Sequence, residues 1–470
     1  MIDHIRLQVN TKLNPKNKHI FGQFMTPSVI ADYMASLFDK KLNKVKLLDC
    51  GAGIGSLSIS AIKALKDIAL VELWEIDTIM QEQLKKNMQD IKVQFTIYNQ
   101  DYIFSAVENI ISGSGERYTH AIINPPYKKI NSNSEHRKEL RKAGIETVNL
   151  YSAFLALSVM LMEKNGQIVA IIPRSFCNGP YYKSFRNLIM KECSIEHIHI
   201  FDSRNKAFKD DYVLQENIII KIVKGKMQGS VEISRSTDHG FYDYQSKSNP
   251  FSNVVKPSDS ELFIHIPIEE QIENDTLFAV PLSELNLDVS TGPVVDFRMK
   301  EYLEQEPSDG AVPLLYPHHF VNGQLQYPKI HKKANAIRVT PDSQKWLMPN
   351  DGHYVIVRRF SAKEEKRRVV AYIVNPTEIG KDWIGFENHW NFFHIKKHGF
   401  DKKIAMGLTC FLNSTELDNH FRVFSGHTQV NATDLKNMQY PTMKVLRKLG
   451  EAYHITMNQE QIDELIKGTI

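Results

Sequence analysis

Residues 45–55, Val-Lys-Leu-Leu-Asp-Cys-Gly-Ala-Gly-Ile-Gly, decide the fold of this 470-residue chain. An apolar run leads into Asp49 and then into Gly51, Gly53 and Gly55, and a helix-forming stretch follows. This pattern predicts a buried strand, a tight glycine turn and a helix in an open α/β sheet. Glycines let the backbone approach a ligand closely, and Asp49 can accept hydrogen bonds from a cationic amine. A packing turn has the same pattern, so the glycines alone do not identify a ligand.

The next two predicted strands also lead to acidic residues. Strand 71–75 ends in Glu75, and strand 93–98 leads to Asp101 and Phe104. An acid about 20 residues past the glycines can accept both ribose hydroxyls, and Asp101 can accept from an adenine amino group with the phenyl ring beside it. The spacing G-x-G-x-G differs from the dinucleotide pattern and favours a nucleoside that carries an amino acid. Each acid alone is equally well explained as a solvated strand end or a helix cap.

Residues 119–123 form another short apolar run, which predicts a strand ending at Asn124-Pro125-Pro126-Tyr127. The Asn124 side-chain carbonyl and the Pro125 main-chain carbonyl can each accept one N–H of a planar amino group, so that its lone pair points out of the plane. Two prolines hold these acceptors rigidly and add no competing donor. Tyr127 can stack on a flat substrate. The alternative is a rigid turn with no ligand.

Together these motifs resemble the S-adenosylmethionine-dependent adenine amino-methyltransferases of DNA, with the TaqI-type and PstI-type modification enzymes as the nearest relatives. In that arrangement the donor-binding motif precedes Asn-Pro-Pro-Tyr and the recognition domain comes last. Residues 21–27 look like the family's N-terminal donor-binding loop. The resemblance implies S-adenosylmethionine as cofactor, with Thr26 and Pro27 at the methionine carboxylate, Asp49, Gly51 and Gly53 at the amino-acid part, Glu75 at the ribose, Asp101 and Phe104 at the adenine, and Asn124 at the reacting end. Locally, Thr26-Pro27 also fits the start of a helix through Phe38.

Residues 1–245 are predicted to form the catalytic domain, a doubly wound, seven-stranded Rossmann-like sheet of alternating strands and helices. The family uses an aromatic residue between the last two strands as the second face of a base sandwich. Phe208 is the candidate by this resemblance, with Tyr212 as the alternative. Either ring can equally be a core anchor.

A basic stretch follows Asn-Pro-Pro-Tyr and contains Lys128, Arg137 and Arg141. Such a stretch is usually a solvated loop or helix face. Beside a cup for a flipped base it can also contact phosphates. The two explanations do not exclude each other.

Residues 246–470, together with the connector, are predicted to form an α+β target-recognition domain that binds double-stranded DNA. Residues 229–260 are rich in Ser, Asn and Asp and indicate a boundary. Two later stretches are rich in the forked donors and amides that groove recognition uses, and both again resemble the PstI-type enzymes. The candidate DNA contacts there are Arg358, Arg359, His427, Thr428, Gln429 and Asn431. For any one of them, ordinary solvated surface is the alternative.

The composition excludes several classes of protein. The four cysteines include no C-x-x-C pair, so they indicate neither a zinc site nor a disulfide framework. We therefore expect no metal, and we expect a cytoplasmic location. The longest apolar helix, at residues 150–162, is too short to cross a bilayer. A net charge of +4 is too small to prove a nucleic-acid partner. A monomer is favoured.

The leading hypothesis is site-specific methyl transfer to the N6 amine of a flipped-out adenine, as in restriction-modification systems. A separate cognate endonuclease would be a genetic partner, because the chain starts almost at the donor-binding loop. One alternative is a methyltransferase acting on a protein glutamine or an RNA amine, since the cup fits any planar amine. Another is an inactive DNA-binding module on the same scaffold. The DNA target does not follow from the sequence.

Overall fold

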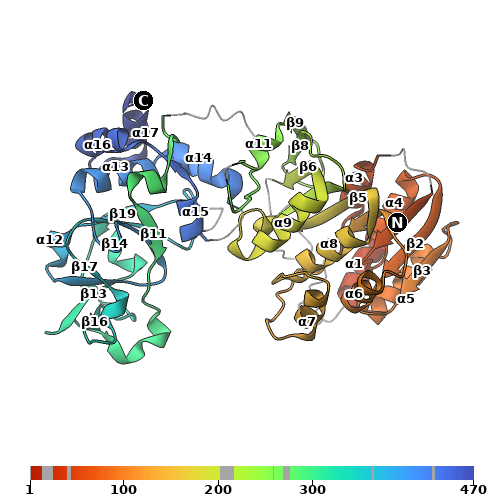
Figure 1. Ribbon diagram of the computed structural model, residues 1–470, viewed down its shortest axis with the longest axis horizontal. Coiled ribbons are helices and arrows are strands. Elements are labelled where there is room, and N and C mark those ends of the chain that lie inside the picture. Colours follow the sequence, from red (N-terminus) through yellow and green to blue (C-terminus); the bar gives the residue numbers. More distant parts are fainter. Residues whose placement is uncertain are drawn as a thin grey trace. The chain divides into compact units, whose positions relative to one another are not determined.

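The computed structural model describes residues 2–12, 25–39, 44–201, 216–257, 259–267, 276–361, 365–425 and 429–469. The chain forms two compact units, Met1–Glu269 and Glu270–Ile470, and Figure 1 labels their elements. The boundary therefore lies later than the expected residue 245. Among the described residues, no helix is both long and apolar enough to cross a membrane.

A nine-stranded sheet forms the centre of the first unit, in the order β3-β2-β1-β4-β5-β7-β6-β8-β9. The first five strands in this order run parallel, while β7 runs antiparallel to both of its neighbours. The strands are β1 (Val45–Asp49), β2 (Ile68–Trp74), β3 (Phe95–Tyr98), β4 (Tyr118–Ile123), β5 (Met162–Pro173), β6 (Cys193–Phe201), β7 (Asn217–Lys224), β8 (Val231–Ser236) and β9 (Gln245–Asn249).

All seven predicted strands are present as β1 to β7, but the expected total of seven was wrong. The stretch predicted as a boundary supplies β8 and β9, which extend one edge of the sheet. In β8, Val231 and Ile233 are buried, whereas four of the five residues of β9 are exposed. An edge strand faces solvent and can be polar throughout. For this reason the hydrophobic pattern gave no signal for β9.

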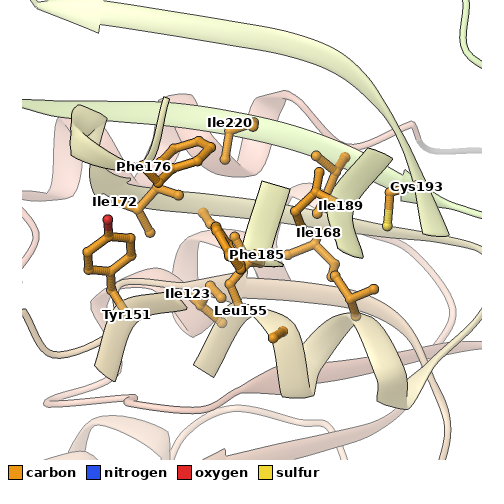
Figure 2. Close-up of a cluster of buried hydrophobic side chains, with 14 of the residues drawn as sticks. Ile123, Tyr151, Leu155, Ile168, Ile172, Phe176, Phe185, Ile189, Cys193 and Ile220 are labelled. Carbon is orange, nitrogen blue, oxygen red and sulfur yellow. The ribbon is translucent and has the colours of Figure 1, made fainter. Parts of the chain in front are cut away.

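Helices cover both faces of this sheet, because the central strands are apolar on both sides. In β5, Ile168 and Ile172 belong to one buried cluster and Val169 and Ile171 to another. Figure 2 shows Tyr151 and Leu155 beside Ile168 and Ile172 in the first cluster. On this face lie α6 (Tyr102–Ser112), α8 (Leu150–Leu161) and α9 (Lys183–Glu192), and on the other lie α3 (Ser28–Ser36), α4 (Ser56–Ala64) and α5 (Thr78–Met88). The doubly wound arrangement predicted from the sequence is confirmed.

The described part of the first unit contains three more helices, namely α1 (Ile2–Lys12), α7 (Glu135–Lys142) and the short α11 (Phe251–Val254). Buried residues of α7 and α11 also join the first cluster. Helix α7 belongs to the segment between Asn-Pro-Pro-Tyr and α8. Backbone hydrogen bonds close this segment at its base, from Ile130 N to Val148 O at 2.8 Å and from Leu150 N to Lys128 O at 2.8 Å.

The second unit contains a four-stranded sheet in the order β11-β21-β18-β19 and a five-stranded sheet in the order β12-β16-β13-β20-β17. Two-stranded pairs join β10 to β22 and β14 to β15. The strands are β10 (Val280–Pro281), β11 (Asp288–Thr291), β12 (Leu303–Glu304), β13 (Ala311–Leu315), β14 (Phe320–Val321), β15 (Gln324–Leu325), β16 (Ala336–Arg338), β17 (Leu347–Pro349), β18 (Tyr354–Arg358), β19 (Ala371–Val374), β20 (Trp383–Phe386), β21 (Trp390–His394) and β22 (Gln439–Tyr440).

The helices of the second unit are concentrated near its C-terminus. They are α12 (Pro376–Ile379), α13 (Lys402–Leu412), α14 (Thr415–Phe424), α15 (Ala432–Lys436), α16 (Met443–Ala452) and α17 (Gln459–Thr469). Helices α13 and α16 approach through two facing glycines. A Cβ atom on Gly407 would lie 1.8 Å from Leu446 O, and one on Gly450 would lie 1.8 Å from Lys403 O. Only glycine fits at this crossing.

Candidate active site

A cavity of about 340 Å³ lies at the carboxyl ends of β1, β2 and β4 in the first unit. Ligands of open α/β sheets bind at this edge. The residues that line it include Thr26, Gly51, Gly53, Glu75, Asp101 and Asn124. Six residues predicted from separate motifs thus meet in one cavity, whose volume suits a small-molecule ligand.

The glycine turn after β1 forms one wall of the cavity. Gly53 and Gly55 have φ of +57° and +89°, in the left-handed region that favours glycine. Asp49, at the end of β1, is completely buried next to the turn and accepts a hydrogen bond from the Ser58 hydroxyl. Its other oxygen, Oδ1, has no hydrogen-bond partner within the described part of the chain. Burial raises the pKa of Asp49 to about 7.

A buried carboxylate oxygen without a donor is costly, and it favours a cationic ligand group nearby. The ammonium of an amino acid is such a group. Asp49 itself is not among the residues that line the cavity, although its neighbours Cys50 and Gly51 are. The expected contact with the amino-acid part of the cofactor therefore stays a prediction, which the unpartnered oxygen supports.

Glu75 links the glycine turn to the loop after β2. Its two oxygens accept backbone hydrogen bonds from Gly53 N at 2.8 Å and from Asp77 N at 2.7 Å. Burial raises the pKa of this carboxyl to about 7, against the lowering effect of these two bonds. Asp77 in turn caps helix α5 by accepting from the amides of Ile79 and Met80. Because a carboxylate has about four lone pairs, Glu75 can still accept from a ribose while it holds the turn.

Asp101 lies at the start of α6 and has a partner that the sequence analysis missed. Its Oδ1 caps the helix by accepting from Ile103 N at 2.9 Å, and its Oδ2 lies 2.7 Å from His136 Nε2. His136 comes from α7 and also lines the cavity. The hydrogen bond to Asp101 raises the pKa of His136. No motif places a histidine here, because the contact depends on how the segment after Asn-Pro-Pro-Tyr folds back.

Phe104 is not among the residues that line the cavity, and 37% of its surface is exposed. Its ring instead lies 5.4 Å from the His136 ring. Phe104 is three residues into α6, so it lies farther along the helix than Asp101, which forms its cap. A position of this ring beside the adenine stays a prediction.

Asn124 is held in one orientation at the end of β4. Its Nδ2 donates to Thr26 Oγ1 at 3.0 Å, and its Oδ1 accepts from the Tyr127 hydroxyl at 2.9 Å. Both Asn124 and Pro126 line the cavity. The Thr26 hydroxyl thereby fixes the amide so that its carbonyl oxygen is the end available to a substrate donor, and this oxygen has a second lone pair.

Tyr127 and Pro27 have positions that the sequence did not predict. The Tyr127 hydroxyl turns toward Asn124 and also lies 3.1 Å from Ile171 O, while its ring meets Tyr151 edge to face at 6.3 Å. Stacking on a substrate stays a prediction for this ring. Pro27 is the N-cap of α3, so the helix begins one residue later than expected. Phe208 and the alternative Tyr212 lie outside the described residues.

The basic residues after Asn-Pro-Pro-Tyr divide into two kinds. Lys128 is exposed and lines the cavity. Arg137 is only 8% exposed, and its Nε donates to Glu146 at 2.7 Å. Arg141 is exposed and pairs with the same carboxylate at 2.8 Å. For Arg137 the observed role is the ion pair with Glu146, and a phosphate contact stays a prediction for all three residues.

Of the predicted DNA contacts in the second unit, the described residues lie in one neighbourhood; they are Arg358, Arg359, Gln429 and Asn431. Arg359 Nη1 donates to Asn388 O at 3.2 Å and its Nη2 to Gln429 Oε1 at 3.4 Å, and Arg358 pairs with Glu365. Asn431 is the N-cap of α15, where the side chain of Asp434 accepts from its backbone amide at 2.9 Å. Its predicted role in DNA reading therefore competes with a structural one. His427 and Thr428 fall outside the described residues.

The cavity fits an amino-acid-bearing nucleoside better than a metal ion. It is lined by the carboxylates Glu75 and Asp101 and by the backbone of the glycine turn, and the unpartnered oxygen of Asp49 lies behind the lining residues Cys50 and Gly51. No group of three or more His, Cys, Asp or Glu side chains that could hold a metal occurs among the residues described. The four cysteines are buried and free.

Comparisons with known proteins agree with this geometry. The family model of the Eco57I restriction-modification methylase matches residues 35–208. The type II methyltransferase M.BsuBI of Bacillus subtilis is 51% identical over 96% of this chain and 93% of its own length. M.PstI of Providencia stuartii is 39% identical over 100% and 97%. A tRNA1(Val) (adenine(37)-N6)-methyltransferase of Shewanella woodyi is 28% identical over 37% of this chain and 76% of its own.

Among solved structures, the type IIL restriction-modification enzyme MmeI in complex with DNA shares the fold, with a TM-score of 0.53 at 12% identity, over 100% of this chain and 74% of MmeI. The DrdV–DNA complex has a TM-score of 0.52 at 13% identity, over 93% of this chain and 57% of that one. At this level of identity the likeness concerns the fold alone.

The sheet, the cavity at its carboxyl edge and these relatives define an S-adenosylmethionine-dependent methyltransferase of the restriction-modification class. Within that class, the chain belongs to the family of type II methyltransferases that includes M.BsuBI and M.PstI. Its cofactor is S-adenosylmethionine.

Proposed function

We propose that the chain methylates the exocyclic N6 amine of adenine at a specific site in double-stranded DNA. The observation that carries the proposal is the position of Asn124-Pro125-Pro126-Tyr127, two residues of which line the cofactor cavity. An amine held there lies next to the methyl donor. The Shewanella woodyi relative, whose name states adenine-N6 chemistry, supports adenine as the acceptor.

The chain's own residues prepare the acceptor nitrogen. The Asn124 side-chain carbonyl, oriented by Thr26, and the Pro125 main-chain carbonyl accept the two N–H bonds of the amine, which aims its lone pair out of the ring plane. S-adenosylmethionine supplies a methyl group on a positively charged sulfur, which becomes a neutral thioether as nitrogen bonds to the methyl. The methylated nitrogen then loses a proton to water, so no strong base is needed beside it.

Adenine has to leave the helix to reach this position. Flipping a base out of the stack costs a few kcal/mol, and stacking in the site offsets part of that cost. Tyr127 and an aromatic residue opposite it, with Phe208 as the candidate, are proposed to sandwich the base. The proposed acceptor also explains why the second unit is needed, because the base has to be chosen before it is flipped.

Replacing Asn124 with alanine tests the proposal. We expect methyl transfer to DNA to fall about 100- to 1,000-fold, because a preorganised hydrogen-bonding group is lost. Cofactor binding, measured by calorimetry, is expected to change little. Asn253→Ala, an exposed asparagine on α11, is the matched control and should remain fully active. Normal turnover by Asn124→Ala would overturn the assignment.

An RNA amine is the second candidate, because the Shewanella woodyi relative acts on tRNA according to its name. That relative matches only about a third of this chain, whereas M.BsuBI and M.PstI match the second unit as well. This favours DNA. Incubating the enzyme with labelled S-adenosylmethionine and equal amounts of DNA, tRNA and a glutamine-containing protein extract would rank the acceptors. An inactive scaffold would label none of them.

Sequencing the modified bases in DNA from cells that express the protein would identify both acceptor and target. We expect N6-methyladenine at one short sequence. A separate endonuclease that cuts the same sequence is the proposed genetic partner, and the protein is proposed to act as a cytoplasmic monomer. The free, buried cysteines accord with that compartment.

A further inference from the structure

The described part of the second unit exposes four large apolar side chains. They are Phe297 at 64%, Ile330 at 99%, Phe360 at 45% and Ile455 at 44% of their surface. Single exposed apolar residues are common and need no explanation, whereas a cluster of them marks an interaction site. An ion pair, a backbone bridge and a ring contact join the segments that carry the first three.

An ion pair joins the loop of Phe297 to that of Ile330. Asp296, which precedes Phe297, forms a salt bridge with Lys333. The ammonium of Lys333 also lies 5.7 Å from the ring of Tyr316. The two loops are therefore neighbours, although more than thirty residues of sequence separate their tips.

Backbone contacts join the Phe297 loop to that of Phe360. Val294 forms a bridge with Glu387, and Asn388 N donates to Val294 O at 2.9 Å. Next to this bridge, the His389 ring lies 5.0 Å from the Phe360 ring. Three separate segments, each with one exposed apolar tip, are thus neighbours in the fold.

The backbone on both sides of Ile330 is held firmly. Asn335 is 1% exposed. Its Oδ1 accepts a hydrogen bond from Lys329 N, and its Nδ2 donates one to Lys329 O, both at 3.0 Å. On the other side, the His331 ring stacks on that of His318 at 3.9 Å. An isoleucine that is fully exposed on a braced loop has little conformational entropy to lose on binding.

Cations are interleaved with the three tips. Arg298 lies over the Phe297 ring at 5.5 Å, and Lys332 and Lys333 follow Ile330 in sequence. Arg359 precedes Phe360. The carboxylates nearby include Asp296, which pairs with Lys333, and Glu387, which is completely buried beside His389. Gln305 donates to the carbonyls of His331 and Lys333, so its neighbours Glu304, which pairs with Arg338, and Glu306 also lie close to the Ile330 loop. We call the tips Phe297, Ile330 and Phe360 with the cations Arg298, Lys332, Lys333 and Arg359 the loop face.

We propose that the loop face docks onto double-stranded DNA, with its cations on the phosphates and its apolar tips in a groove against the base pairs. The inference rests on the proposed function, because it takes DNA as the substrate. Apolar side chains such as Phe and Ile act as wedges at base steps in other protein–DNA contacts, and flanking Lys and Arg neutralise the backbone. The loop face combines both kinds of group on rigid loops, so the second unit deforms or senses DNA shape as well as reading base edges.

The test uses the full-length protein with Phe297→Ala, Ile330→Ala and their double variant. Fluorescence anisotropy with a duplex that contains the site methylated by the wild type is expected to show about tenfold weaker binding for each single variant and about 100-fold for the double. The KM for DNA should rise in parallel while kcat at saturating DNA stays near that of the wild type. Lys332→Gln should reduce the slope of log affinity against log salt by about one.

Ile455→Ala is the matched control, since it removes an exposed isoleucine of the same unit that lies outside the loop face. It should bind DNA within about twofold of the wild type. Calorimetric binding of S-adenosylmethionine and the melting temperature should be unchanged in all variants. If the wild type methylates DNA and the loop-face variants bind it normally, the docking proposal is overturned alone. If the wild type neither binds nor methylates DNA, both proposals are overturned.

Discussion

The two units present their functional side chains in opposite ways. In the first unit, Asp49, Glu75 and Asn124 are placed at strand ends and held by other parts of the fold, in or beside a cavity. In the second unit, Phe297 and Ile330 extend from loops into solvent. Chemistry on a small cofactor needs groups fixed before binding, whereas contact with a large polymer needs groups that reach outward. Buried polar atoms therefore identify the cavity of the first unit, and exposed apolar atoms define the proposed loop face of the second.

The largest effect on function is expected from a substitution of Asp49, and it tests whether this buried polar group serves the cofactor. Asp49→Asn keeps the shape of the side chain but removes the charge that we expect to meet the cofactor's ammonium. We expect S-adenosylmethionine to bind about 100-fold more weakly, since losing one partner of a buried charge pair costs several kcal/mol. Titration calorimetry measures this directly. Unchanged affinity would show that the unpartnered Oδ1 does not serve the ligand.

The same substitution should increase the free energy of unfolding at high pH, although it weakens cofactor binding. The pKa of Asp49 is raised by burial to about 7, so the native state holds its proton more strongly than the unfolded chain does. This contribution to stability is present at about pH 4 and below, and is lost as pH rises toward 7. Asp49→Asn should therefore be more stable than the wild type at pH 8, by up to a few kcal/mol, and similar to it near pH 4. Urea unfolding without cofactor at both pH values checks the sign.

An intermediate effect, on the free energy of unfolding, is expected at the close crossing of α13 and α16 in the second unit. Gly407→Ala places a methyl group where Leu446 O already lies, so α13 and α16 have to move apart. We expect a loss of about 1–3 kcal/mol in the free energy of unfolding. Gly468→Ala is the control, because nothing lies within 4 Å of the added atom at that helical glycine. Equal stability of the two variants would contradict the close crossing.

The smallest effect is expected at His136. Removing its side chain with His136→Ala frees Asp101 to rotate, and we expect S-adenosylmethionine to bind about tenfold more weakly, the value of one hydrogen bond to a charged group. His136→Asn, which keeps a donor, should recover part of the loss. Phe104→Ala removes the ring that lies 5.4 Å from the ring of the same histidine, and it should weaken binding less than His136→Ala does. If His136→Ala binds normally, the pair with Asp101 serves the fold only.

The polar residues at the ends of the parallel strands could be found from the sequence for a physical reason. Buried parallel strands have to be apolar, and their polar ends then stand out, so Asp49, Glu75, Asp101 and Asn124 could be found from pattern alone. Contacts made by segments that fold back could not be found in this way. Neither the bond from His136 to Asp101 nor the turn of the Tyr127 hydroxyl toward Asn124 leaves a local signal.

The second unit was harder to predict because its strands are short and its loops long. Arg358 and Arg359 stay predicted DNA contacts, because neither the burial nor the pairing of a basic side chain can be read from the sequence, as Arg137 shows in the first unit. The loop face was missed because its three tips lie far apart in the chain. Only the contacts of Asp296 and of Val294 bring them together.

The hydrophobic clusters on the large sheet and on the two smaller sheets each lie within one unit. Those on the two faces of the large sheet draw on residues up to Ile266, and those of the two sheets in the second unit begin at Val294. Each unit therefore has a hydrophobic core of its own, which is what a domain needs in order to fold by itself.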